Sequence, residues 1–290
     1  MKFSLSVSFC SHTHYLPLAR AAERGLWHSI NVADGLFYYE TPSNDYPYTP
    51  DGSRFWHGKT HFPDPFIAVG MMAAATERIQ FFTNIFKLPV RNPYLVAKET
   101  ATLACMSNHR FALGVGLSPW QDDFSLCGQE WANRGPRCGE MIEVIRKLHS
   151  GEMVEHQGKY YQFEPMQMAP VPKDQPMPIY IGGLAEPVLR RAARLADGWL
   201  SVNAPLDDIV AKMQQLRTML LDNDRDPASF EFKVMATDIA DLDGFSRLAE
   251  LGVTEAVVMP QFFYGGNPGD LDYKIESTER FSEEVIAKLQ

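Results

Sequence analysis

Two histidines near the N-terminus are the first residues whose spacing could support chemistry. His12 and His14 are separated by one residue, an arrangement with which the metal site of a hydrolase can begin. Such a site also needs histidines and an aspartate from later segments, and the chain has no histidine after His156. We therefore expect no metal ion, and we interpret His12 and His14 as residues of a loop or pocket lining.

Mechanisms that depend on a protein nucleophile find little support in the sequence. No Gly-x-Ser-x-Gly motif is present, and no lysine closes a predicted strand in the second half of the chain. Cys10 follows the first predicted strand, where a buried structural thiol is the usual state. Lys87 lies just past another strand and better supplies a positive charge. Since few acids and bases accompany many aromatic residues and glycines, we expect a bound flat cofactor to carry the chemistry.

Two adjacent glycines offer a place where such a cofactor could bind. Gly182 and Gly183 come just before a predicted helix that runs from about Glu186 to Ala196. Backbone N–H groups at a helix N-terminus, together with the helix dipole, form a phosphate-binding site. A glycine pair is also common in ordinary turns, so this pair alone leaves both interpretations open.

The elements that position these residues are clearest between Ile79 and Ser118. Ile79–Phe86 is a β-branched and aromatic run that predicts a strand buried on both faces. Asn92 is a plausible N-cap, and Pro93 suits the first helical position. A second buried strand, Arg110–Gly116, follows this helix. Two parallel strands joined by a helix form a βαβ unit.

The same alternation of strand and helix extends along the whole chain. We predict strands at 3–9, 29–33, 79–86, 110–116, 179–181, 198–202, 230–236 and 256–259. We predict helices at 16–24, 66–75, 93–107, 138–150, 186–196, 206–222, 245–251 and 277–289. Eight such pairs without a linker predict one α/β domain over residues 1–290, a TIM (β/α)₈ barrel. Functional residues are then expected at the carboxyl ends of the strands.

Two segments interrupt the regular alternation. Residues 34–65, here called the aromatic loop, carry many Tyr, Trp and Phe residues among prolines and glycines after the second strand. A loop of this length is expected to bind a ligand or to act as a lid. Residues 154–163, broken at Gln157-Gly158, predict a β-hairpin inserted before the fifth strand.

Composition limits the partners and the compartment. The chain has 290 residues, 45% of them hydrophobic, and a formal net charge of −9. This charge, without a dense Lys/Arg run, argues against a nucleic-acid partner. Four cysteines form no CxxC pair and no leader precedes the first strand, so we expect a reduced, cytoplasmic location. No apolar run approaches the roughly 20 residues of a membrane helix, so we expect no membrane partner.

Eight short motifs follow one another along nearly the whole chain: Ala21–Gly25, Val32–Asp34, Thr76–Ile79, Leu88–Pro93, Ala97–Glu99, Arg110–Gly116, Pro178–Gly183 and Arg191–Trp199. Together they resemble the luciferase-like monooxygenase superfamily of flavin- and deazaflavin-dependent barrel enzymes. Within the aromatic loop, Tyr46–Gly52 resembles the branch of F420-dependent oxidoreductases. The resemblance also implies a homodimer.

The resemblance implies that a flavin-type ring lies across the barrel mouth and that its phosphate is held by backbone amides. Members of the family often have a non-prolyl cis peptide bond behind the ring. The implied cofactor-binding residues are Thr83, Asn84, Ile85, Gly116, Leu117, Ser118, Gly182, Gly183 and Leu184. Three cations could bind the anionic cofactor tail, namely Lys59, Lys87 and Arg91.

One position departs from the family pattern. Many members have a histidine directly after the aspartate that closes the second strand, where it contacts the ring or acts as acid or base. Here Asp34 is followed by Gly35. The candidate catalytic residues are therefore His12, His14, Asp34, Tyr38 and His57.

Three functional hypotheses follow. The first is an oxidoreductase that transfers a hydride between coenzyme F420 and a small organic substrate held under the aromatic loop. The second is an FMN-dependent luciferase-like monooxygenase that uses oxygen, for which an apolar lid would exclude water. The third is a flavin-binding protein without turnover, suggested by Gly35 and the few ionisable groups.

Overall fold

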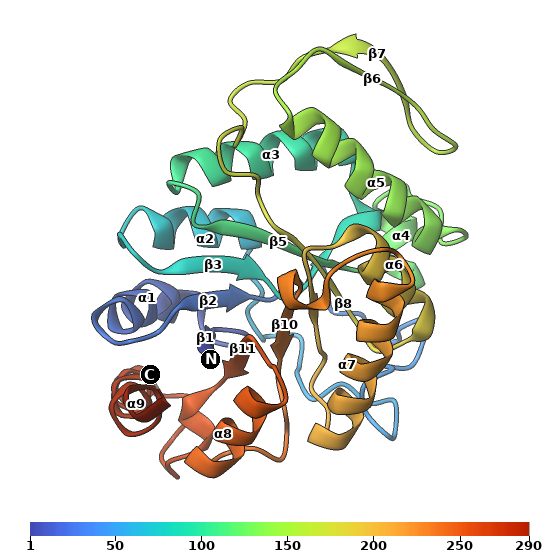
Figure 1. Ribbon diagram of the computed structural model, residues 1–290. Coiled ribbons are helices and arrows are strands. Elements are labelled where there is room, and N and C mark those ends of the chain that lie inside the picture. Colours follow the sequence, from blue (N-terminus) through green and yellow to red (C-terminus); the bar gives the residue numbers. More distant parts are fainter. Residues whose placement is uncertain (290) are drawn as a thin grey trace.

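Eight parallel strands form a closed barrel in the computed structural model, which describes residues 1–289 (Figure 1). The strands are β1 (Lys2–Ser6), β2 (Ser29–Val32), β3 (Gln80–Thr83), β5 (Phe111–Gly116), β8 (Ile179–Gly182), β9 (Gly198–Leu200), β10 (Glu231–Val234) and β11 (Glu255–Val258). Their order is β3-β2-β1-β11-β10-β9-β8-β5, and β3 pairs with β5 to close the ring. The predicted TIM barrel is confirmed. A two-residue strand, β4 (Phe86–Lys87), extends the pairing beside β5.

Helices surround the barrel (Figure 1). The larger ones are α1 (Tyr15–Arg24), α2 (Pro65–Ala73), α3 (Pro93–Met106), α5 (Arg134–His149), α6 (Glu186–Leu195), α7 (Leu206–Leu221), α8 (Leu242–Glu250) and α9 (Leu271–Phe281). A short helix, α4 (Gln121–Leu126), lies in the loop after β5. A π-helical turn at Ser282–Ile286 joins α9 to α10 (Ala287–Leu289).

Side chains cap the starts of α2, α3, α8 and α9. The predicted cap at Asn92 is confirmed, because its side chain accepts the N–H of Tyr94 at 2.9 Å. In contrast, α5, α8 and α9 begin at 134, 242 and 271 rather than at the predicted 138, 245 and 277. The carboxylates of Asp241 and Asp270 cap α8 and α9, and these signals precede the first clearly periodic apolar residues.

Both predicted interruptions are present. Strands β6 (Val154–Gln157) and β7 (Gln162–Met166) form an antiparallel hairpin that projects from the barrel before β8 (Figure 1). The Glu140 carboxylate of α5 holds its tip by accepting the N–H groups of Tyr160 and Tyr161. The aromatic loop contains no regular helix or strand before α2, and it packs at the carboxyl ends of the strands.

The buried apolar residues form two clusters. Most of the hydrophobic core, including Phe3, Trp27 and Trp199, lies between the strands and the helices. A second apolar cluster, Phe82, Ala112, Tyr180, Leu200 and Val257, comes from five different barrel strands, so it fills the interior. The interior therefore is a packed core below the mouth.

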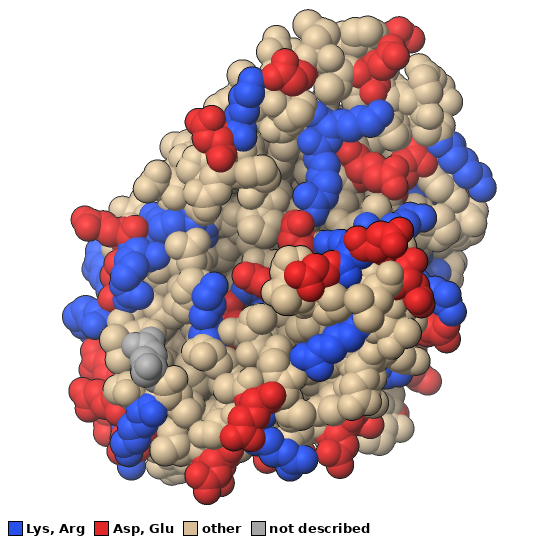
Figure 2. All heavy atoms as spheres, viewed as in Figure 1, with Lys and Arg blue, Asp and Glu red and all other residues tan. Residues whose placement is uncertain are grey.

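The outer surface carries both signs of charge. Acidic and basic side chains are interspersed over the face shown in Figure 2. Among residues 1–289, no helix is long and apolar enough to cross a membrane.

The barrel closes at a position where a side chain would not fit. The N–H of Gly114 donates to the Thr83 hydroxyl at 2.9 Å, and this hydroxyl donates to the Gly114 carbonyl at 2.7 Å. A Cβ at Gly114 would overlap the Thr83 carbonyl oxygen and lie 2.6 Å from a methyl carbon of Leu200. The contact between β3 and β5 thus requires glycine.

We predict that Gly114→Ala lowers the free energy of unfolding by at least about 3 kcal/mol, because backbone must move to admit the methyl group. Gly70→Ala is the matched control. Gly70 is in the middle of α2, and an added Cβ would meet only Leu103 at 3.9 Å. That variant should gain about 0.5–1 kcal/mol from helix propensity. Urea denaturation measures both, and equal stability of the two variants would contradict the prediction.

Candidate active site

A cavity of about 1030 Å³ opens at the carboxyl ends of the barrel strands, and we call it the mouth cavity. Strand ends line one part of it, including Gly182 and Leu200. The aromatic loop contributes Phe37, Tyr38, Tyr46, Tyr48, Phe55, Trp56 and Phe62. Ligand pockets usually have volumes of about 300–1,000 Å³. The mouth cavity therefore has room for a flat cofactor and a substrate together.

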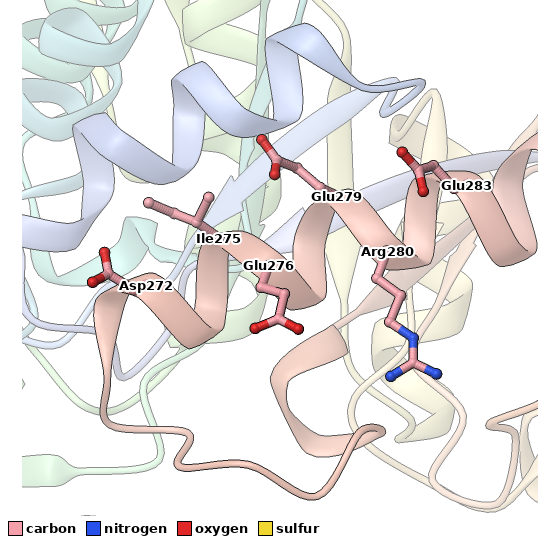
Figure 3. A pocket seen from close by; sticks show the side chains of 6 residues that line it. All are labelled: Asp272, Ile275, Glu276, Glu279, Arg280 and Glu283. Atoms are coloured by element: carbon pink, nitrogen blue, oxygen red, sulfur yellow. The ribbon is translucent and has the colours of Figure 1, made fainter.

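A second hollow lies on the outer surface of α9 and the turn that follows it (Figure 3). Its lining residues are Asp272, Ile275, Glu276, Glu279, Arg280 and Glu283. Glu279 pairs with Arg24 at 2.7 Å, and Arg280 pairs with Glu284 at 2.9 Å. None of the predicted site residues lies here, so the candidate active site is the mouth cavity.

Ile85 forms part of the cavity surface and fits against two glycines. The Asn84–Ile85 peptide bond is cis, as the family resemblance implies, and both residues line the cavity. A Cβ at Gly116 would overlap the Ile85 side chain, and a Cβ at Gly182 would lie 2.6 Å from it. Gly116 therefore supports Ile85 from behind without lining the cavity, whereas Gly182 does both. Thr83 is buried below them.

The glycine pair before α6 uses one of its amides in the fold itself. The N–H of Gly183 donates to the Leu200 carbonyl at 3.2 Å, and the Gly183 carbonyl accepts the Trp199 indole N–H at 2.8 Å. Within residues 1–289, the amides of Leu184 and Ala185 donate to no backbone carbonyl. These two amides precede α6 and fit a phosphate group better than the amide of Gly183 does.

The charged side chains at the mouth are paired with one another. Both Asp34 oxygens bind the Arg91 guanidinium, at 2.6 and 2.8 Å, and one also accepts the Lys87 N–H at 2.9 Å. The Lys87 ammonium contacts the buried Asp123 carboxylate at 2.8 Å. Lys87 and Arg91, two of the three cations that the sequence suggested for a cofactor tail, are thus already paired with carboxylates. Lys59, the third, is exposed on the aromatic loop.

Asp123 of α4 joins several of these groups, and sequence reasoning missed it. Its carboxylate accepts the Tyr39 hydroxyl at 2.8 Å as well as the Lys87 ammonium and the Ser118 hydroxyl. Burial and this hydrogen bond to Asp123 raise the pKa of Tyr39. The Ser118 hydroxyl therefore binds Asp123, and Ser118 does not line the cavity, whereas its neighbour Leu117 does. No motif in the sequence marked Asp123, because Tyr39 and Lys87 come from two distant segments of the chain.

We predict that Asp123→Asn lowers the free energy of unfolding by about 3–5 kcal/mol, because it leaves the buried Lys87 ammonium without a carboxylate. Asp122→Asn is the matched control. Asp122 is on the same helix, and its oxygen accepts the Ser43 N–H, which an asparagine can still do. The control should lose much less stability. Similar denaturation midpoints for the two variants would argue against a buried ion pair at Asp123.

The first two histidines lie outside the mouth cavity. His12 Nδ1 is 2.9 Å from Nδ1 of His61, so the pair links the end of the aromatic loop to the turn after β1. The Lys274 ammonium lies 3.1 Å from His14 Nδ1, and burial together with this charge lowers the pKa of His14. Among residues 1–289, no group of three His, Cys, Asp or Glu side chains could hold a metal ion.

His57 and Tyr38, by contrast, line the cavity. The His57 Nδ1 atom accepts the Lys59 N–H at 3.2 Å, so the neutral ring carries its proton on Nε2. At the departure from the family pattern, a Cβ on Gly35 would lie 2.6 Å from the Phe62 ring. The Phe62 ring thus occupies the space that a histidine at position 35 would need.

Comparison with known proteins gives the family. Residues 17–243 match the family model for luciferase-like monooxygenases. The full chain is 39% identical to an uncharacterized protein of Mycobacterium tuberculosis, with all of both chains covered. An F420-dependent glucose-6-phosphate dehydrogenase of Nakamurella multipartita is 30% identical over 189 residues, which cover 64% of this chain and 51% of that protein. The chain therefore belongs to the luciferase-like monooxygenase family, and it is an oxidoreductase or monooxygenase.

Solved structures share the fold. A monooxygenase from Streptomyces bottropensis has a TM-score of 0.76 and 17% identity, with 100% of both chains covered. An F420-dependent secondary alcohol dehydrogenase, solved with an F420-acetone adduct, has a TM-score of 0.75 and 17% identity, with 99% of both chains covered. At these identities the likeness concerns the barrel architecture.

Proposed function

We propose that this chain is a cytoplasmic, homodimeric oxidoreductase that transfers a hydride between bound coenzyme F420 and a small organic substrate. The proposal rests on one observation, which is that the charged groups of the mouth cavity are paired within the protein. Asp34 and Lys87 are the charged residues that line it, and both are paired within the protein. The cavity thus offers a shaped, largely apolar space, and the redox chemistry comes from the deazaflavin when it is bound.

The residues present fit such a cofactor. The surface made by Asn84, Ile85 and Gly182 gives a planar ring an apolar support. The free amides of Leu184 and Ala185 lie at the start of α6, where backbone N–H groups and the helix dipole favour a phosphate. F420 is preferred to FMN because the family relative from Nakamurella multipartita, at 30% identity, is an F420-dependent dehydrogenase.

We predict that F420 binds the apo-protein saturably and raises its melting temperature, and that FMN at the same concentration does so much less. A ligand that binds only the folded state, present at 100 times its Kd, adds about 2.7 kcal/mol of stability. Absorbance titration and a thermal melt measure the two effects independently. Saturable binding of FMN without binding of F420 would overturn the cofactor assignment.

We also propose that His57 supplies or accepts the proton that accompanies hydride transfer. The Nε2–H group of His57 is free to contact a substrate, because the Nδ1 atom already accepts the Lys59 N–H. Tyr38 also lines the cavity, and its ring packs against Gly58, the residue after His57, since a Cβ on Gly58 would be 3.2 Å from that ring. The Arg54 guanidinium stacks 3.8 Å from the centroid of that ring and fixes its orientation. A substrate oxygen between His57 and Tyr38 would thus meet two donors.

The prediction for His57→Asn is a fall in kcat of about 10²–10⁴-fold with unchanged affinity for F420, because general acid–base catalysis contributes this much. His61→Asn is the matched control. His61 is on the same loop and is also exposed, but it pairs with His12 outside the cavity. Steady-state turnover of a panel of ketones and secondary alcohols measures kcat. An unchanged kcat in His57→Asn would remove His57 from the mechanism.

The second candidate is an FMN-dependent monooxygenase that uses oxygen. The dense set of rings over the cavity favours it, since a reaction of this kind must exclude water. Consumption of oxygen by the protein with reduced FMN and a substrate panel would support this candidate over the first.

A further inference from the structure

The exposed aromatic side chains of this protein are confined to one place. Among residues 1–289, every exposed Phe or Tyr side chain lines the mouth cavity, and no Trp is exposed. They are Phe9, Phe37, Tyr38, Tyr48, Phe55 and Phe262. Large apolar side chains exposed elsewhere are Leu, Ile or Met. Exposed apolar area that is gathered at one concave site marks a ligand-binding surface.

These side chains continue into a set of packed rings, which we call the aromatic wall: Phe9, Tyr46, Phe55, Trp56, Phe62 and Trp120. Ring centroids lie 5.1 Å apart for Phe9 and Phe55, 5.0 Å for Phe55 and Trp56, and 4.9 Å for Tyr46 and Trp56. Phe9 has a φ of +63°, a conformation that costs a non-glycine residue about 1–2 kcal/mol. Phe9 follows β1 in the chain, and its ring packs against the aromatic loop. The unfavourable conformation therefore occurs where the barrel meets the loop.

The same cavity offers no free ion to a charged ligand. Asp34 is bound by Arg91 and Lys87 by Asp123, as described above. The aromatic loop has two cations: Arg54 stacks on Tyr38, Lys59 is exposed, and neither lines the cavity. A phosphate or carboxylate placed against the aromatic wall would lose its hydration without gaining a counter-ion, and such burial is unfavourable.

We infer that the mouth cavity takes an uncharged substrate with a large apolar, aromatic or polycyclic body, and that it discriminates against phosphorylated or carboxylated molecules. The apolar body contacts the aromatic wall, and a single polar oxygen faces His57 and Tyr38. This inference deepens the proposed function and rests on it for the reaction, although binding to the wall does not depend on the cofactor. It also separates this chain from relatives that are named for a sugar phosphate.

The test compares three probes on the full-length protein by isothermal titration calorimetry: 2-acetonaphthone, 6-acetyl-2-naphthoate and glucose 6-phosphate. The first two share one carbon skeleton and differ by a carboxylate. We expect the uncharged ketone to bind saturably and at least about tenfold more tightly than the naphthoate, with glucose 6-phosphate weaker still. Equal or tighter binding of either anion would overturn the inference.

A variant pair ties the binding to the aromatic wall. Phe55 is 61% exposed, and Leu126 is a 66% exposed residue of α4 that does not line the cavity. Both truncations to alanine should therefore fold, which circular dichroism checks. Phe55→Ala should weaken ketone binding about tenfold, because a ring contact and apolar burial are lost, whereas Leu126→Ala should not change it. Unchanged binding in Phe55→Ala would overturn the assignment to the wall.

The readouts distinguish this inference from the proposed function. Cofactor absorbance, followed with the ketone present, reports hydride transfer, and calorimetry reports only binding. Selective ketone binding without any change in cofactor absorbance supports the substrate class and contradicts the F420 reaction with this ketone. If the protein turns over a ketone but binds the anionic probes as tightly as the uncharged one, the substrate class is contradicted and the reaction is supported.

Discussion

The close approach of β3 to β5, and of Ile85 to β5 and β8, is permitted by glycines, and the mouth cavity depends on this constraint. Gly114 allows the backbone of β3 to close the barrel, and Gly116 and Gly182 admit the side chain of Ile85. A side chain at Gly114 would displace the Thr83 backbone, and one at Gly116 or Gly182 would displace the Ile85 side chain. The shape of the surface on which a cofactor ring would lie is thus set by the absence of three Cβ atoms.

Around that surface, the protein satisfies its own charges before any ligand is bound. The bidentate Asp34–Arg91 pair ties the end of β2 to the turn before α3, and the buried Lys87–Asp123 pair ties β4 to α4. Such pairs contribute little net stability, but each becomes costly when one partner is lost. Their effect on function is to leave the cavity nearly free of net charge. Selection among ligands then depends on shape, apolar area and the few neutral donors.

The aromatic loop contains both the position at which many family members have a histidine and a second histidine that lines the cavity. The Phe62 ring fills the space next to Gly35, and His57, from the same loop, lines the cavity. A group on a loop depends on how the loop is anchored, and here the Tyr39 hydroxyl is held by the buried Asp123 carboxylate. The anchoring residues are far from one another in sequence, and they meet only because the loop folds over the mouth.

The sequence by itself determined the alternation of strand and helix, the aromatic loop, the hairpin before β8 and the family. These features follow from local apolar periodicity and from short motifs, which the chain carries without reference to its tertiary contacts. It also placed Ile85, Gly182 and His57 among the candidates. Only the tertiary structure showed that Gly116 supports Ile85, that Ser118 and Lys87 serve Asp123, and that His12 turns to His61. Side-chain pairing between distant segments is decided by three-dimensional packing, and no local pattern encodes it.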